Sequence, residues 1–135
     1  MTQENKDLLL KDLCARLPYG VKVQRYSYED DVETIETLRE IDSDGCMSTL
    51  ECETLKYIAK PYLFPLSSMT EEQLYNNPIG FSQMLTIKAD RDWENITINR
   101  RAYYKLEDWF NKNHFDYRGL IPMGLANDAT GLNIY

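Results

Sequence analysis

Residues 5–28 read Asn-Lys-Asp-Leu-Leu-Leu-Lys-Asp-Leu-Cys-Ala-Arg-Leu-Pro-Tyr-Gly-Val-Lys-Val-Gln-Arg-Tyr-Ser-Tyr, and they carry the clearest helix and strand signals of the chain. Leucines recur every four residues in the first part: Leu9, Leu13 and Leu17. This spacing predicts an amphipathic helix over residues 5–17. A proline and a glycine, Pro18 and Gly20, then end the helix.

Extended segments follow this helix. Valines alternate with polar residues after the proline, which predicts a strand over residues 20–28. Apolar residues spaced by three between 32 and 38 also fit a helix, but β-branched residues favour a strand over 34–41. Turn chemistry at residues 42–45 (Asp-Ser-Asp-Gly) then predicts a hairpin with a second strand over 46–52.

The middle of the chain mixes strand and helix signals. Residues 55–58 look extended, and the run 60–65 holds two prolines, so we expect an edge strand or a connector there. A capped helix is expected from residues 67–73, where Ser68 or Thr70 can bind its free N–H groups. Asn76-Asn77-Pro78 closes this helix.

The last third of the chain ends in a helix and a series of turns. Residues 83–89 and 95–99 are expected to pair as strands. Aromatic and leucine side chains at three- to four-residue spacing predict a helix over 100–113. Glycines and a proline predict turns in the tail, with one helical turn at 117–121.

Together these segments predict a single α+β domain over residues 1–135. We expect an N-terminal helix, a small antiparallel sheet of three to five strands, and a C-terminal aromatic helix packed on the sheet. The length of 135 residues fits one domain of this kind.

Composition excludes several classes of function. The chain holds 15 Lys and Arg against 22 Asp and Glu, a formal charge of −7, so we do not expect general nucleic-acid binding. Its apolar runs are too short to cross a membrane, and its first residues lack the pattern of a secretory signal. Three cysteines without paired spacing suit a reducing cytoplasm, where we expect the protein to act.

One segment has the spacing of a calcium-binding loop. Residues 40–51 place oxygen-bearing side chains and Gly45 as in an EF-hand. Glu40 stands where the tight turn requires the shorter Asp, and the flanking segments are weak helices. We therefore keep weak calcium binding only as an alternative and predict no metal or cofactor.

The only histidine lies in the tail, beside two charged residues. Asp116 could orient the His114 imidazole for acid–base chemistry, and the planar fork of Arg118 could hold an anion. The same residues also fit a structural role, with His114 at a helix end and Asp116 paired to Arg118. A small enzyme using His114 and Asp116 is therefore an alternative, and we expect a protein without catalytic residues.

Three blocks of the chain resemble a known group of proteins. They are residues 6–23, residues 60–73 (Lys-Pro-Tyr-Leu-Phe-Pro-Leu-Ser-Ser-Met-Thr-Glu-Glu-Gln) and residues 109–121 (Trp-Phe-Asn-Lys-Asn-His-Phe-Asp-Tyr-Arg-Gly-Leu-Ile). They are similar to small, uncharacterised proteins encoded by phages and mobile elements of gut bacteria. The resemblance implies a phage or prophage context, in which small acidic proteins often bind and block a component of the host.

We therefore expect a non-enzymatic binding protein that sequesters a host component, with counter-defence as one such role. The expected partner is a host protein, met through tyrosine-rich area, or a small anionic signalling nucleotide. The predicted surface joins the bend after the first helix to the tail: Tyr19, Arg25, His114, Asp116, Tyr117 and Arg118. The acidic total charge favours the protein partner. Association of copies through sheet edges stays open.

Overall fold

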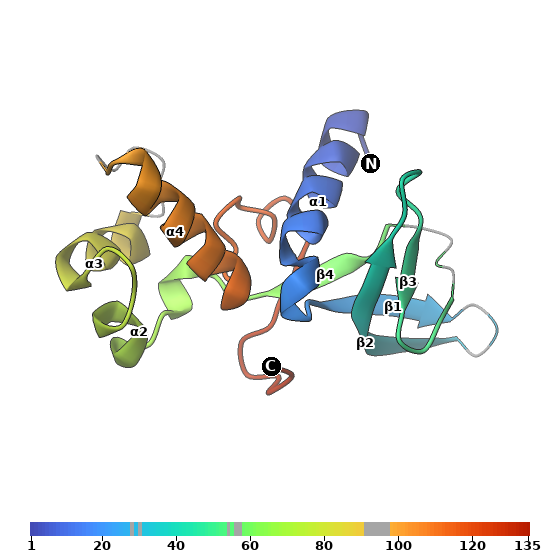
Figure 1. Cartoon of the computed structure of the whole chain (residues 1–135). Helices are drawn as coiled ribbons and strands as arrows, with labels where there is room; N and C mark the ends of the chain where they lie inside the picture. Colours follow the sequence, from blue (N-terminus) through green and yellow to red (C-terminus); the bar gives the residue numbers. More distant parts are fainter. Residues whose placement is uncertain (28, 30, 54, 56–57, 91–97) are drawn as a thin grey trace.

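The computed structural model describes residues 1–27, 29, 31–53, 55, 58–90 and 98–135. Helices gather on one side and strands on the other, with the first helix and the tail between them (Figure 1). The elements in chain order are α1 (Gln3–Arg16), η1 (Leu17–Tyr19), β1 (Lys22–Ser27), β2 (Val32–Ile41), β3 (Met47–Thr49), β4 (Lys60–Leu63), η2 (Leu66–Ser68), α2 (Glu71–Tyr75), α3 (Phe81–Asp90), α4 (Arg100–Lys112) and β5 (Asn127–Asp128).

The N-terminal helix is confirmed as α1. The Thr2 side chain caps it by accepting a hydrogen bond from the Asn5 N–H. Gly20 follows the 3-10 turn η1 with a φ of +68°, a left-handed conformation that glycine adopts without strain. The face of α1 that packs on the sheet buries two of the predicted leucines, Leu9 and Leu13.

The sheet has five strands in the order β3-β2-β1-β4-β5. The predicted hairpin is confirmed, because β2 pairs with β3 and also with β1, both antiparallel. The short strand β5 adds to β4 in a parallel direction, so the sheet is mixed rather than purely antiparallel. The fold class is thus α+β, as the sequence predicts.

The proline-containing run 60–65 does not form the edge strand or connector that we expected. Part of it is strand β4, which lies between β1 and β5. Pro61 is tolerated because it lies at the beginning of the strand, opposite Val23, while Tyr62 and Leu63 pair with β5.

The expected strand over 83–89 is wrong, because this segment lies within helix α3. The buried side chains of α3 are Met84 and Ile87, three residues apart, which is the helical period. Residues 95–97 of the proposed partner strand and residues 56–57 of the expected extended piece lie outside the described residues. The tail forms turns, but residues 117–121 do not form a helical turn.

Two hydrophobic clusters divide the interior. The first lies between α1, the sheet and the turn at residues 120–126. The second contains side chains of α2, α3 and α4 together with the tail residues Phe115 and Tyr117. We call the part of the molecule that holds this second cluster the helical lobe. Helix α4 packs mainly within the helical lobe; the tail after it reaches the sheet through a bridge between Phe115 and Phe64.

Candidate functional site

The fold brings the end of α1 and the bend after it against α4 and the tail. The Arg16 Nη2 atom donates to the carbonyl oxygen of Phe115 at 2.6 Å. The Tyr19 hydroxyl donates to the Asp108 carboxylate on α4, and the pKa of Tyr19 is raised mainly by this hydrogen bond. The two stretches that the sequence analysis placed in one surface are therefore neighbours.

Most of the predicted site residues are nevertheless buried rather than open to a ligand. The exposed fractions of the three tail residues and of the Arg118 side chain are 8% for His114, 7% for Asp116, 7% for Tyr117 and 11% for Arg118. The Tyr117 hydroxyl and the Arg118 guanidinium contact each other, and Arg118 also contacts Asp12 on α1. We call this set, together with Asp12, Arg16 and Asn111, the buried network.

The centre of the buried network is an ion pair on α1. Asp12 and Arg16 are both 0% exposed, and Asp12 Oδ2 accepts from Arg16 Nε at 2.9 Å. Asp12 Oδ1 lies 3.3 Å from Arg118 Nη1, so one carboxylate compensates two guanidinium groups. The Nη1 atom of Arg16 is buried without a hydrogen-bond partner among the described residues.

Tyr117 joins this ion pair to α4. Its hydroxyl accepts from Arg118 Nη1 at 2.7 Å and donates to Asn111 Oδ1 at 2.8 Å. Both guanidinium groups also lie over its ring, with Arg118 at 4.6 Å and Arg16 at 5.3 Å from the ring centre. Burial raises the pKa of Tyr117 to about 12, so the hydroxyl stays neutral.

His114 lies beneath the last residue of the chain. Its ring stacks on Tyr135 with 3.7 Å between ring centres, and its Nδ1 atom is buried without a partner among the described residues. Burial, with Arg16 and Lys22 nearby, lowers the pKa of His114 to about 4. The imidazole is therefore neutral at pH 7.

Asp116 organises the tail. Its two carboxylate oxygens accept from the backbone N–H groups of Leu120 and Ile121, at 2.8 and 2.9 Å. Burial raises its pKa, although these two hydrogen bonds oppose the shift. No hydrogen bond joins Asp116 to His114 in the described structure, so the acid–base pair considered in the sequence analysis is not assembled.

Arg25 does not join the other site residues. It lies on β1 and pairs with Glu36 on β2, with 3.1 Å between Nη1 and Oε2. Glu36 also accepts from the hydroxyls of Thr34 and Thr49. Burial alone would raise the pKa of Glu36, but these hydrogen bonds and Arg25 lower it.

A cavity of about 360 Å³ opens beside the tail. Its walls are formed by the segment after β4, the turns between α4 and β5, and the end of β5: Pro65, Leu66, Ser67, Asp116, Tyr117, Gly119, Ile121, Pro122 and Asp128. The charged side chains among these residues are carboxylates. A small anion would therefore meet charge of its own sign at this cavity.

The calcium-loop segment is a hairpin turn. Residues 40–51 include the end of β2 and all of β3, so strands stand where an EF-hand needs helices. The Asp42 carboxylate accepts from the N–H groups of Asp44 and Cys46, which stabilises the turn. The described residues hold no group of three or more His, Cys, Asp or Glu side chains placed to bind a metal.

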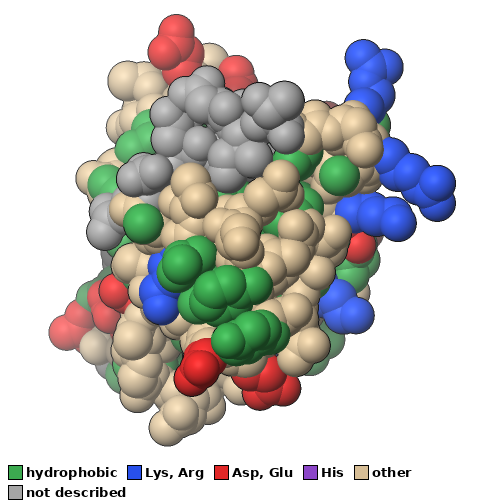
Figure 2. Space-filling view, turned by 90° about the vertical axis from the view of Figure 1, so that its left-hand side faces the viewer, with side chains coloured by type: hydrophobic (Ala, Val, Ile, Leu, Met, Phe, Trp, Pro, Cys, Tyr) green, Lys and Arg blue, Asp and Glu red, His purple; other side chains and the backbone are tan. Residues whose placement is uncertain are grey.

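The sequence analysis missed an exposed apolar surface on the helical lobe. Tyr75 at the end of α2 stacks on Phe81 at the start of α3, with 4.6 Å between ring centres. Leu85, one turn further along α3, is also exposed. We call these three residues the apolar patch, and Figure 2 shows hydrophobic side chains gathered on this face. The spacing of Phe81 and Leu85 was a helical signal that the strand prediction for 83–89 hid.

His114, Asp116, Tyr117 and Arg118 are thus bonded to the fold or shielded from water. In the described residues, no helix is long and apolar enough to cross a membrane.

Comparison with protein-family models, with curated proteins and with solved structures finds no match to this chain.

Proposed function

We propose that this chain is a non-enzymatic binding protein whose partner is a protein of a bacterial host. The observation that carries the proposal is the apolar patch, in which Tyr75 is 62% and Leu85 is 44% exposed. Aromatic side chains that already stack on one another lose little entropy when a partner covers them. Clustered exposed aromatic and aliphatic side chains are typical of interaction sites.

Two alternatives lose support from the contacts of the tail. Acid–base catalysis needs a histidine that titrates near neutral pH and meets its substrate, whereas His114 has a pKa of about 4 and lies beneath Tyr135. At the predicted surface a small anionic nucleotide would need free cations, whereas Arg118 is paired there with Asp12, and Arg25 is paired with Glu36. A protein partner requires neither a histidine that titrates near neutral pH nor free cations at that surface.

The phage or mobile-element context is part of the proposal. It rests on the resemblance of the three sequence blocks and makes a component of the host cell the expected target. The three cysteines, Cys14, Cys46 and Cys52, are free, which is compatible with the reducing bacterial cytoplasm as the place of action.

The test is affinity capture from a lysate of the host bacterium with the full chain as bait. Tyr75→Ser/Leu85→Gln removes much of the apolar patch. Leu50→Ser/Leu132→Gln is a matched control, because Leu50 is 63% and Leu132 is 45% exposed outside the helical lobe.

We expect one host protein to be retained by the wild type, by the control and by His114→Gln, and to be lost with the patch variant. Circular dichroism checks that all variants fold. Equal retention by the patch variant and the control would contradict the proposal, as would an activity that His114→Gln abolishes.

A further inference from the structure

Helix α4 carries a basic face on an acidic protein. Its four cations are exposed and no ion pair joins them to any residue that the structure describes: Arg100, Arg101, Lys105 and Lys112. The two acids of the same helix offset these cations only in part: Glu107 lies 3.9 Å from Arg118, and Asp108, which accepts a hydrogen bond from the Tyr19 hydroxyl, keeps its charge between Lys105 and Lys112. The exposed side of α4 is therefore positive although the whole chain has a charge of −7.

The position of the two arginines is unfavourable for the isolated helix. Arg100 and Arg101 are its first two residues, directly after the Asn99 cap, and the first turn of α4 holds no acid. The helix dipole makes this end positive, so an uncompensated cation there is repelled by the dipole. An anionic group of a partner would remove this repulsion.

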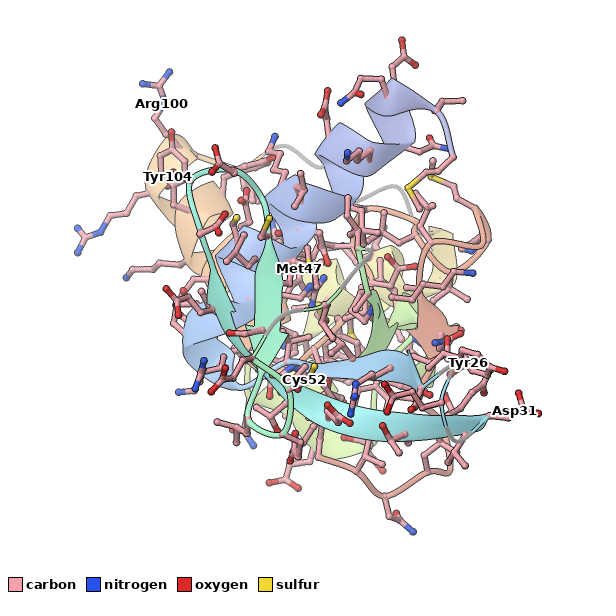
Figure 3. All side chains as sticks on the ribbon, turned by 90° about the vertical axis from the view of Figure 1, so that its right-hand side faces the viewer. Tyr26, Asp31, Met47, Cys52, Arg100 and Tyr104 are labelled. Carbon is pink, nitrogen blue, oxygen red and sulfur yellow. The ribbon has the colours of Figure 1, made fainter. Side chains whose placement is uncertain are left out.

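The basic face lies beside the apolar patch. Leu106 and Phe110 on α4 share the second hydrophobic cluster with Met84 and Ile87 on α3. In Figure 2 a group of Lys and Arg side chains stands along one edge of the face that carries the hydrophobic side chains, and one further basic side chain lies beside the hydrophobic group. Figure 3 shows Arg100 and Tyr104 pointing away from the body of the molecule into solvent. One partner segment can thus contact both surfaces.

We infer that the partner presents an acidic amphipathic segment, whose apolar side covers the apolar patch and whose carboxylates meet the basic face of α4. The inference rests on the proposed function and adds the chemistry of the partner. Arg101, Lys105 and Lys112 are spaced by four and seven residues, so they line one side of α4. Tyr104, which is 62% exposed, adds contact area between them and Arg100.

An acidic protein segment fits this surface better than a nucleic acid. The apolar patch must be covered by apolar side chains, which a phosphate backbone does not offer. Leu85 offers no ring on which a base could stack, and the rings of Tyr75 and Phe81 are stacked on each other. The acids Glu71 and Glu72 on α2, at the other end of the patch, would further repel phosphates and orient an acidic partner toward α4.

The test reverses the charge of the basic face in the capture experiment described above. Arg101→Glu/Lys105→Glu is compared with Lys6→Glu/Lys11→Glu, which changes the net charge equally on the exposed side of α1. A zero-length carbodiimide cross-linker, which joins lysine amines to carboxylates, is applied to the wild-type complex. A labelled 20-nucleotide single-stranded DNA is the second probe.

We expect retention of the host protein to fall at least tenfold with Arg101→Glu/Lys105→Glu and to stay within twofold of wild type with the control. Cross-links should join Lys105 or Lys112 to Asp or Glu of the partner. The inference is overturned if the patch variant loses the partner while the charge reversal does not. It is also overturned if the DNA binds the wild type and not the reversed variant. If no host protein is retained at all, the result contradicts both the proposed function and the inference that rests on it.

Discussion

The ion pair between Asp12 and Arg16 allows a quantitative test of how the fold is held together. Both side chains are 0% exposed, and Asp12 also compensates Arg118. Asp12→Asn keeps the shape of the side chain but leaves the Arg16 guanidinium without a counter-charge. Charges about 4 Å apart attract by about 4 kcal/mol at an effective dielectric constant of about 20. Breaking a buried pair by removing one partner typically costs about 3–5 kcal/mol.

We therefore expect Asp12→Asn to lower the free energy of unfolding by about 3–5 kcal/mol, which is a large part of the about 5–15 kcal/mol of a typical domain. Urea denaturation at pH 7, followed by circular dichroism, measures it. Lys11→Gln, at the neighbouring exposed position, is the control and should change stability by less than about 0.5 kcal/mol.

The double variant Asp12→Leu/Arg16→Met removes both charges. Only the partly exposed Arg118 then loses a partner, and Glu107 still lies 3.9 Å from it, so the double variant should recover most of the stability that Asp12→Asn loses. A loss below about 1 kcal/mol for Asp12→Asn would refute the reasoning, since it would mean that water reaches Arg16. A double variant as unstable as the single variant would also refute it, because geometry rather than charge would then be the cause.

Further predictions concern the tail, the sheet and one helix cap. Since the pKa of His114 is about 4 in the fold and about 6.5 in an unfolded chain, the unfolded state takes up the proton first, and stability should fall by about 3 kcal/mol as the pH drops from about 6.5 to about 4. His114→Asn should flatten this part of the pH–stability curve. Tyr135→Ala should raise the pKa of His114 in a nuclear magnetic resonance titration, because it removes the stacked ring that shields the imidazole. Glu36→Ala should cost about 2–3 kcal/mol in urea denaturation, whereas Arg25→Ala, whose side chain is 28% exposed, should cost less than about 1 kcal/mol. Thr70→Ala should cost about 1 kcal/mol, because it removes the capping box of α2.

Elements with strong local signals could be predicted from the sequence. This holds for helices α1 and α4 and for the β2–β3 hairpin. Their signals are side-chain spacing, helix caps and a turn, all of which depend on residues close together in the sequence. Strand β4 could not be placed because its two neighbours come from distant parts of the chain, and Pro61 argued locally against a paired strand. Helix α3 was hidden because the β-branched pair Thr86-Ile87 lies in its buried stretch.

The candidate site could be predicted only in part. The proximity of the bend near Tyr19 to the tail was expected, and the contact of Arg16 with Phe115 places them together. The sequence does not show which charged side chains lack an ion pair, because the partners of these ion pairs are distant in the chain. Asp12 and Arg118, 106 positions apart, are the clearest case. The same reasoning applies to α4, because only the structure shows that no ion pair joins its four cations to a described residue.

The buried network also changes how a loss of binding must be interpreted. Arg118 contacts Asp12 on α1, Glu107 on α4 and the hydroxyl of Tyr117, so it links the sheet side of the molecule to the helical lobe. Arg118→Ala would loosen that link and displace the apolar patch even if no partner touches Arg118. Loss of binding in this variant alone therefore does not identify an anion site. Arg118→Lys separates the two roles: it keeps a positive charge for a bound anion, but its single nitrogen cannot bond Asp12 and Tyr117, as Nη1 does, and also face Glu107, as Nη2 does. If Arg118 acts through the fold, Arg118→Lys and Arg118→Ala should lose stability and binding together. A variant that keeps full stability and loses binding would instead place Arg118 in the interface.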